Sequence, residues 1–463
     1  MKIKQLKIKY WAQGLAVLLL TTLNGCKKLI TVNPPTTELV SSVVYTDSAT
    51  VQTAVVGLYA NMAFTYSTAN PYAYGLSTLP GFSADELQYV GSTYNQFIDN
   101  GIPVTDPYAE GVWSFSYSVI YAANSVIYGV QNGSGMSDSF SNQAIAQAKF
   151  VRAFCYFYLT NLYGAVPLVL TTDVAQNSAL AQSPSAAVYQ QIISDLQFAQ
   201  SKLATDYSGS AGQRTMANQW AATALLARAY LYTGDWVDAE AQATAVIGNT
   251  SLYGLSTNLA TVFTPSNSEA ILQFNNSATG YTAFAGAVLP NAVAAVPTYI
   301  LTSQLVNAYE AGDSRRAAWL DSLTYNGSVY YYPYKYKSLI FGANAEYYTL
   351  LRLAEQYLIR AEARAEQGNI SGAQADINVI RNRAGLGNTT AGDQASLLAA
   401  VAQERRIELN CEWGHRWLDL KRTGTANAIL GAEKTTWTAT GVLWPIPNAE
   451  ISANSKLAQN AGY

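Results

Sequence analysis

Two stretches of the chain carry the same pattern of small and apolar residues. Within residues 225–247 and again within 351–385, apolar positions recur at three- and four-residue steps, which predicts a helix, a turn and a second helix. A glycine falls at each predicted turn, where helices commonly end. The spacing small-x6-Gly-x4-small is formed by Ala227, Gly234 and Ala239 in the first stretch and by Ala361, Gly368 and Ala373 in the second.

This shared spacing predicts helix hairpins of the tetratricopeptide type, because two helices pack closely only where small residues let their backbones approach. In the second hairpin we expect helices over residues 350–366 and 371–383, with Ser371 as the N-cap of the latter. The two hairpins are not adjacent in the sequence, which excludes a plain solenoid. Two unrelated alanine-rich hairpins are the alternative.

Other parts of the chain differ sharply in periodicity. Helical periods predict further helices over 113–127, 145–163 and 188–199. By contrast, the segments 64–108 and 249–346 show little helical period and are rich in Tyr, Asn, Ser, Thr and Gly.

We therefore predict a mostly α fold within one domain spanning residues 39–463. A tetratricopeptide-like scaffold is expected over about 110–248 and 347–425. The segments 64–108 and 249–346 are expected to form long, loop-rich insertions on the side of the ligand.

The N-terminus has the features of a bacterial lipoprotein signal. Within residues 1–25, four lysines precede an apolar run that is too short for a permanent membrane span. The run ends in the letters LNGC, which resemble a lipobox. We predict cleavage before Cys26, lipidation of Cys26 and a polar tether over residues 26–38, since two or more acyl chains anchor a protein stably. A simple secretory signal with a chance cysteine is the alternative.

The composition is poor in charge and rich in tyrosine. Charged residues make up 12% of the chain, about half the usual share, and 33 Tyr outnumber 13 Phe and 9 Trp. Such a composition is typical of extracellular carbohydrate-handling proteins. The net charge of −3 becomes −7 when residues 1–25 and their four lysines are removed. Because no basic face is available to neutralise phosphates, nucleic acid is excluded as a partner.

Few residues suited to catalysis or metal binding are present. His415 is the only histidine, which excludes most nucleophilic triads and histidine metal sites. We expect His415 to pack in a buried polar cluster, a general base being the alternative. Signatures of serine hydrolases, zinc proteases, phosphate loops and dinucleotide sites are missing from the sequence. We therefore predict no catalytic residue, no metal site and no enzymatic activity, and expect Cys155 and Cys411 to be buried thiols.

Two groups of charged residues have competing interpretations. Asp85 and Glu86 resemble a glycosidase pair, but neighbours on a helix point apart and could not flank one glycosidic bond. Glu86 is therefore expected near a helix start, and Asp85 is kept as an acceptor for sugar hydroxyls. The charged run 403–422 predicts an ion-pair network that holds the C-terminal helix to the second hairpin, an active site being the alternative.

The loop tyrosines fit ligand binding. Sugar rings present flat C–H faces that stack on aromatic planes, and their hydroxyls bond to polar side chains. The alternative is that tyrosine only fills loops that lack other hydrophobic residues. The predicted ligand-binding residues are Tyr72, Tyr74, Asp85, Tyr89, Tyr94, Tyr325 and Tyr330.

Several segments together resemble the SusD/RagB family of outer-membrane nutrient-binding lipoproteins of Bacteroidetes. They include the lipobox with the tether CKKLITVNPPTTE, the segment AKFVRAFCYFYLTNLYGAVPLV, and VYQQIISDLQFA. The second hairpin, ERRIELNCEWGHRWLDLKR and the tail PIPNAEI…LAQNAGY complete the set, which spans nearly the whole mature chain in order. Residues Asn454-Ser455 stand where relatives commonly have Asn-Pro.

The resemblance implies a lipid-anchored protein on the outside of the outer membrane. It further implies a lid on a SusC-like TonB-dependent transporter, which receives captured oligosaccharide or polysaccharide fragments without covalent chemistry. The family's sugar-binding aromatic residues follow no motif and cannot be transferred to this chain. No cofactor is expected, and whether Ca2+ assists binding stays open because no calcium loop is visible. The alternatives are a peptide or other nutrient as ligand, or a scaffold that binds no ligand.

Overall fold

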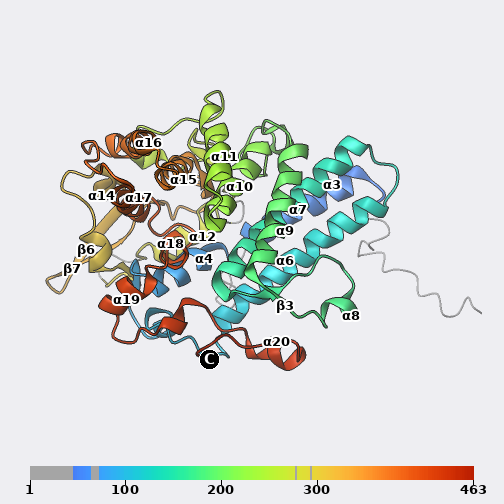
Figure 1. Cartoon of the computed structure of the whole chain (residues 1–463), viewed down its shortest axis with the longest axis horizontal. Coiled ribbons are helices and arrows are strands. Elements are labelled where there is room, and N and C mark those ends of the chain that lie inside the picture. The colour runs from blue at the N-terminus through green and yellow to red at the C-terminus, as the bar shows by residue number, and fades with distance from the viewer. Residues whose placement is uncertain (1–44, 64–71, 277–278, 292–294) are drawn as a thin grey trace, which may run out of the picture. The chain divides into compact units, whose positions relative to one another are not determined.

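The computed structural model describes residues 45–63, 72–276, 279–291 and 295–463 (Figure 1). The predicted signal peptide, Cys26 and the tether lie outside the described residues. Residues 45–463 make up one compact unit. None of the helices in the described ranges is both long enough and apolar enough to cross a membrane.

A layer of long helices forms the N-terminal part of this unit. Its members are α3 (Ser48–Ala63), α6 (Pro107–Asn132), α7 (Asp138–Tyr163) and α9 (Ser185–Lys202). Helix α7 packs against both α6 and α9 (Figure 1) and is buried on nearly all sides, as expected for a helix without a polar face. Arg152 of α7 donates to Asp195 of α9 at 2.8 Å and to Asn124 of α6 at 2.7 Å, so one side chain joins three helices.

The two predicted hairpins continue this layer. Their helices, with one that follows, are α10 (Gln219–Thr233), α11 (Trp236–Gly248), α15 (Leu353–Glu366), α16 (Ile370–Arg383) and α17 (Gln394–Glu408). Helix α11 packs on α15, so the hairpins lie side by side although about a hundred residues separate them in the sequence. The four alanines of the shared spacing are fully buried. Gly234 and Gly368 both adopt positive φ at the turns, which glycine does without strain.

Two predicted boundaries in the second hairpin are wrong. Helix α15 begins at Leu353 rather than at residue 350, because Tyr348–Arg352 forms strand β8. The N-cap of α16 is Asn369 rather than Ser371, and its side chain accepts a hydrogen bond from the Gly372 N–H at 3.0 Å. The start of α16 is set by the side chain that accepts a hydrogen bond from a free N–H group of the first turn, and Asn does this as well as Ser.

The segments expected to be irregular hold short elements instead. Residues 72–108 contain α4 (Tyr72–Ser83), β1 (Leu87–Tyr89) and α5 (Asn95–Ile98). Helix α4 is buried along most of its length, so its sequence lacks the polar face that would have revealed a helical period. It lies beside α12 (Ala283–Val288) and α18 (His415–Arg422) (Figure 1).

Strands of the described residues pair in four two-stranded antiparallel sheets. The pairs are β1 with β5 (Tyr299–Leu301), β2 (Val166–Pro167) with β3 (Gln182–Ser183), β4 (Ala270–Phe274) with β8, and β6 (Leu320–Tyr325) with β7 (Ser328–Pro333). The register of the first pair sets Leu87 opposite Leu301 and Tyr89 opposite Tyr299. The first insertion is thus joined to the second through a shared sheet.

Short helices complete the described elements. They are α8 (Val174–Asn177), α13 (Ser303–Val306), α14 (Ser314–Trp319), α19 (Ala426–Glu433) and α20 (Asn448–Ala453), with 3-10 turns at Ser208–Ser210, Leu259–Thr261 and Ala439–Val442.

The charged run 403–422 forms the ion-pair network that the sequence predicts. Buried Glu408 accepts hydrogen bonds from Arg315 at 3.1 Å, from Arg352 at 2.6 Å and from Arg383. Burial alone would raise the pKa of Glu408, but these three guanidinium groups hold it well below its usual value.

The network extends further than predicted. Arg352 of β8 also pairs with Glu269 and Glu412, and Lys335 donates to Glu412 at 2.5 Å. Arg422 pairs with Glu362 of the second hairpin. The network therefore fastens both the second hairpin and the second insertion to the C-terminal helices.

Candidate functional site

Aromatic rings from both insertions meet at the β1–β5 sheet. The rings are Tyr74 and Phe82 of α4, Tyr89 of β1, Tyr94 at the N-cap of α5, Tyr108 of α6 and Tyr299 of β5. We call these six residues the tyrosine platform. Three of them, Tyr74, Tyr89 and Tyr94, are predicted ligand-binding residues that the structure brings together.

Five of the six platform rings contact one another in defined geometries, and Tyr74 interacts electrostatically with Tyr94 and Tyr299. Phe82 stacks on Tyr94 with ring centroids 5.2 Å apart and on Tyr299 at 5.7 Å. Tyr89 meets Tyr94 edge to face at 4.8 Å and Tyr299 at 5.2 Å. Tyr108 lies tilted against Tyr94 at 4.9 Å. Offset and edge-to-face pairs of this kind hold rings in fixed orientations.

Buried members of the platform support partly exposed ones. Phe82, Tyr94 and Tyr299 have side chains that are almost completely covered, whereas Tyr89 and Tyr108 are half-buried. The Tyr94 and Tyr299 hydroxyls share a hydrogen bond, and burial raises the pKa of both groups. Both phenols therefore stay neutral, and the exposed ring surface is fixed before any ligand arrives.

A polar hollow of about 240 Å³ borders the platform at Phe82. Exposed Gln88, Asp99 and Gln304 contribute amide and carboxylate groups to its lining. Lys434 also lines it, but its ammonium group already donates to the carbonyl oxygens of residues 82 and 83 and to Asn100. Burial lowers the pKa of Lys434 to about 8. The hollow thus offers hydrogen-bonding groups with little free positive charge.

Asp85 lines the same hollow and is held by two arginines. Arg416 donates to both of its carboxylate oxygens at 2.7 and 2.9 Å, and Arg406 donates at 2.7 Å. Burial would raise the pKa of Asp85, but Arg416 and Arg406 together lower it. These contacts give the Asp85 carboxylate a structural role as the partner of two arginines. A hydrogen bond from a sugar hydroxyl to Asp85 stays a prediction.

The remaining predicted residues lie elsewhere or lack a described side chain. Tyr325 and Tyr330 belong to the β6–β7 hairpin, on the face that also carries Leu323. This hairpin packs against β5, so it borders the platform through that strand. Tyr72 is the first residue of α4, and its side chain lies outside the described part of the structure.

Phe82, Tyr108 and Tyr299 belong to the platform but are absent from the predicted set. Tyr299 is more than two hundred residues from Tyr89 in the sequence. Tyr299 reaches Tyr94 only because β1 pairs with β5. Neither of these three-residue strands carries a pattern strong enough to predict that pairing. Tyr108 directly follows Pro107 at a helix start, a position that suggests a role in the fold rather than in ligand binding.

The histidine and both cysteines of the described residues are buried. His415 is buried, and burial together with Arg228 and Arg405 holds its pKa well below the usual value. Cys155 and Cys411 are buried thiols outside any disulfide, as predicted. The described residues contain no cluster of His, Cys, Asp and Glu suited to a metal ion. What the platform offers is aromatic surface and neutral hydrogen-bonding groups.

Comparison with protein families identifies two models that match different parts of the chain. The model described as "SusD family" matches residues 327–463, and the model described as "Starch-binding associating with outer membrane" matches residues 42–231. SusD-like protein P2 from Formosa agariphila is 28% identical in sequence, over 96% of this chain and 98% of its own length.

Solved structures share the fold. A laminarin binding SusD-like protein superposes with a TM-score of 0.71 at 24% identity, covering 90% of this chain and 99% of its own. Surface glycan-binding protein A from Bacteroides uniformis superposes with a TM-score of 0.78 at 19% identity, covering 90% of this chain and 100% of its own. The predicted mostly helical, tetratricopeptide-like fold is confirmed.

Proposed function

Because the chain belongs to the SusD/RagB family, we propose that it captures glycans at the cell surface through the tyrosine platform. The observation that carries the proposal is the set of partly exposed tyrosines supported from below by buried aromatic rings. A pyranose ring can lay its C–H face on Tyr89 or Tyr108 while its hydroxyls bond to the neighbouring polar hollow.

Relatives support carbohydrate as the ligand class. One matching family model is described as starch-binding, one structural neighbour binds laminarin, and another is a surface glycan-binding protein. The polar hollow adds amides and carboxylates, which are the usual partners of sugar hydroxyls. Binding without bond cleavage is the proposed chemistry, since His415 is buried and Asp85 is held by two arginines.

The proposed location is the outer face of the outer membrane. The family model that matches residues 42–231 carries the words "associating with outer membrane". Lipidation at Cys26 supplies the anchor, because two or more acyl chains hold a protein on a bilayer without a spanning helix. A SusC-like TonB-dependent transporter is the proposed partner that receives the captured oligosaccharide.

Affinity electrophoresis tests the proposal. The full chain carrying Cys26→Ser, which removes the lipidation site, is run through gels that contain laminarin, soluble starch or other polysaccharides. We expect one glycan class to retard the protein, and Tyr89→Ala to weaken binding about tenfold, because a lost ring contact is worth about 1–1.5 kcal/mol. Calorimetry with the corresponding oligosaccharide measures the loss.

Tyr128→Ala is the matched control, because Tyr128 is 60% exposed on α6 and lies outside the platform. It is expected to bind like the parent protein. Retardation that is unchanged in Tyr89→Ala, or equally weakened in Tyr128→Ala, would remove the platform as the site. If no glycan retards the parent protein, a peptide ligand or a scaffold role takes the place of glycan capture.

A further inference from the structure

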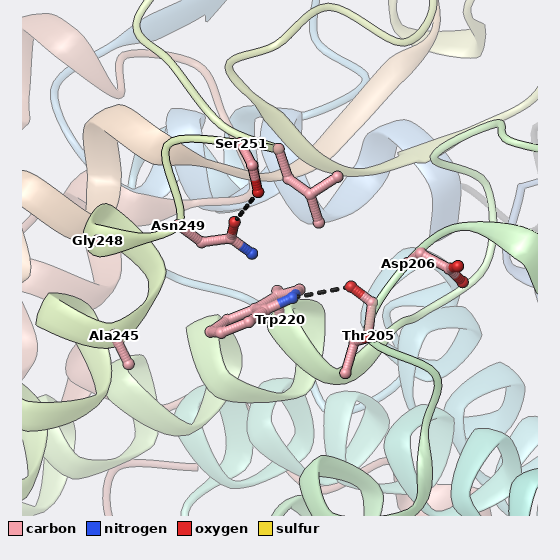
Figure 2. Close-up of a pocket in the computed structure, with 8 residues that line it drawn as sticks. Thr205, Asp206, Trp220, Ala245, Gly248, Asn249 and Ser251 are labelled. Atoms are coloured by element: carbon pink, nitrogen blue, oxygen red, sulfur yellow. Dashed lines mark hydrogen bonds between the residues drawn. The ribbon is translucent and has the colours of Figure 1, made fainter.

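A second hollow lies on the helical scaffold, between the start of α10 and the turn that follows α11 (Figure 2). Its volume is about 560 Å³, and it opens to the surface. The residues that line it are Thr205, Asp206, Trp220, Ala245, Gly248, Asn249, Ser251 and Leu252. None of them belongs to the tyrosine platform or to the hollow beside it.

Trp220 provides a fixed aromatic plane in this hollow. Its indole Nε1 donates to the carbonyl oxygen of Thr205 at 3.0 Å. The ring is half-buried and packs in part against the main hydrophobic core. The hydrogen bond and the packing together set the orientation of the ring, so a ligand that stacks on the exposed part does not have to order it.

Polar groups stand around this aromatic plane. The Asn249 side-chain oxygen accepts a hydrogen bond from the Ser251 hydroxyl at 2.7 Å. This bond turns the Asn249 amide nitrogen toward the space beside Trp220 (Figure 2). Asn249 thus presents a donor at the edge of the indole.

Asp206 also lines the hollow and carries a carboxylate acceptor. One of its carboxylate oxygens accepts from the N–H and the hydroxyl of Ser208. These hydrogen bonds lower the pKa of Asp206, so it is ionised at neutral pH and its second oxygen is available to a hydroxyl donor. No lysine or arginine lines the hollow among the residues that the structure describes.

We propose that the hollow at Trp220 is a second carbohydrate-binding site, specific for an uncharged pyranose unit. An apolar sugar face stacks on the indole, while sugar hydroxyls accept from Asn249 and donate to Asp206. The carboxylate and the missing cation disfavour uronic acids and sulfated sugars. The inference goes beyond the proposed function, since it places a separate contact on the scaffold. Two sites on one chain would bind a long glycan by avidity.

The first experiment isolates the second site from the platform. The full chain with Cys26→Ser and Tyr89→Ala is run against laminarin and soluble starch, with and without Trp220→Ala. We expect residual retardation in the Tyr89→Ala protein, and a further loss of at least about fivefold when Trp220→Ala is added. Trp236→Ala, a half-buried tryptophan of the same hairpin, is the control and should cause no further loss.

A second measurement reads the site directly and does not depend on the platform. The protein is labelled with 5-fluorotryptophan, and the fluorine resonance of residue 220 is assigned through Trp220→Phe. Titration with methyl glucosides, galactosides and mannosides should shift this resonance, and Asn249→Ala should weaken the shift without changing the fold. Methyl glucuronide should have no effect.

The two measurements separate the outcomes. A shifted Trp220 resonance supports the second site even when no polysaccharide binds the platform. The second site is overturned if the resonance moves with none of these sugars and if the polysaccharide retards the Trp220→Ala protein as strongly as the Trp236→Ala protein. Glycan capture by the platform would stand after this result. A response to glucuronide equal to that of the neutral sugars overturns the proposed specificity.

Discussion

The surroundings of Asp85 and Glu86 shift the pKa values of these neighbouring carboxyl groups in opposite directions. Asp85 is buried but lies between Arg416 and Arg406, and these charges lower its pKa. Glu86 is equally buried, yet its hydrogen bond comes from the Cys411 N–H at 3.1 Å, and burial raises its pKa to about 8. A charged partner thus decides whether a buried carboxylate stabilises the fold at neutral pH.

Glu86 makes the stability of the protein depend on pH. Between its ordinary pKa of 4.5 and about 8, Glu86 is protonated in the folded protein and ionised in the unfolded chain. The folded state binds more protons in this window, so raising the pH lowers the free energy of unfolding. We expect Glu86→Gln, which keeps an acceptor for the Cys411 N–H, to be more stable than the parent at pH 8 by at least about 1 kcal/mol.

Urea unfolding at pH 8 and at pH 4 measures this difference, which should vanish at the lower pH. Asp85→Asn is the matched variant, and it should destabilise the protein at neutral pH because Arg416 and Arg406 lose their carboxylate. A loss of stability in Glu86→Gln at both pH values would contradict the assigned protonation.

At the scale of elements, the contact between α4 and α18 depends on one glycine. Gly414, at the N-cap of α18, has φ of +69°, and a Cβ built there would lie 2.8 Å from the Pro80 Cβ and 3.0 Å from the Leu76 carbonyl oxygen. Helix α4 carries Phe82 and Tyr74 of the platform. The close approach at Gly414 therefore sets where part of the platform lies.

Alanine substitution at two glycines separates the cost of backbone strain from the cost of steric overlap with α4. Gly424 has the same φ of +69° but no atom within 4 Å of a built Cβ, so Gly424→Ala should cost only the backbone strain of about 1–2 kcal/mol. Gly414→Ala adds overlap with α4 and should lower the free energy of unfolding by about 1–3 kcal/mol more. Equal losses in urea unfolding would show that α4 can move away freely.

The elements also show which parts of the fold the sequence could predict. Helices of the two hairpins have both small residues at fixed spacing and glycine turns, so they were predictable to within a few residues. Helix α4 was not, because it is surrounded by α3, α12 and α18 and needs no polar face. Tyr74, Tyr89 and Tyr94 could be predicted from composition, whereas Tyr299 required the pairing of two very short strands.

Across the whole molecule, ion pairs join the loop-rich insertion to the scaffold. Lys335, in the insertion, donates to the carbonyl oxygens of residues 408 and 410 and to the Glu412 carboxylate. Arg315, also in the insertion, pairs with Glu404 and Glu408 of α17. With so many buried partners shared, the insertion and the scaffold should open together rather than one after the other.

Hydrogen exchange measures this coupling. We expect amides of β4, in the insertion, and of α15, in the scaffold, to exchange with similar opening free energies. Lys335→Met should accelerate exchange in residues 408–418 as well as in its own segment. Lys337→Met is the control, because the Lys337 ammonium group donates to the carbonyl oxygens of residues 318 and 334, which both lie within the insertion. Acceleration confined to the insertion in both variants would contradict a shared cooperative unit.

The pairing of β1 with β5 restricts how ligand preference can be exchanged between relatives. Transplanting residues 72–108 from a relative without its partner near residue 299 would leave an unmatched strand edge. It would replace five of the six platform rings but not Tyr299, against which Phe82 and Tyr89 pack. A chimera that carries both segments keeps the sheet and the ring contacts together. An exchange of ligand specificity, by engineering or by recombination, therefore has to transfer at least these two distant segments together.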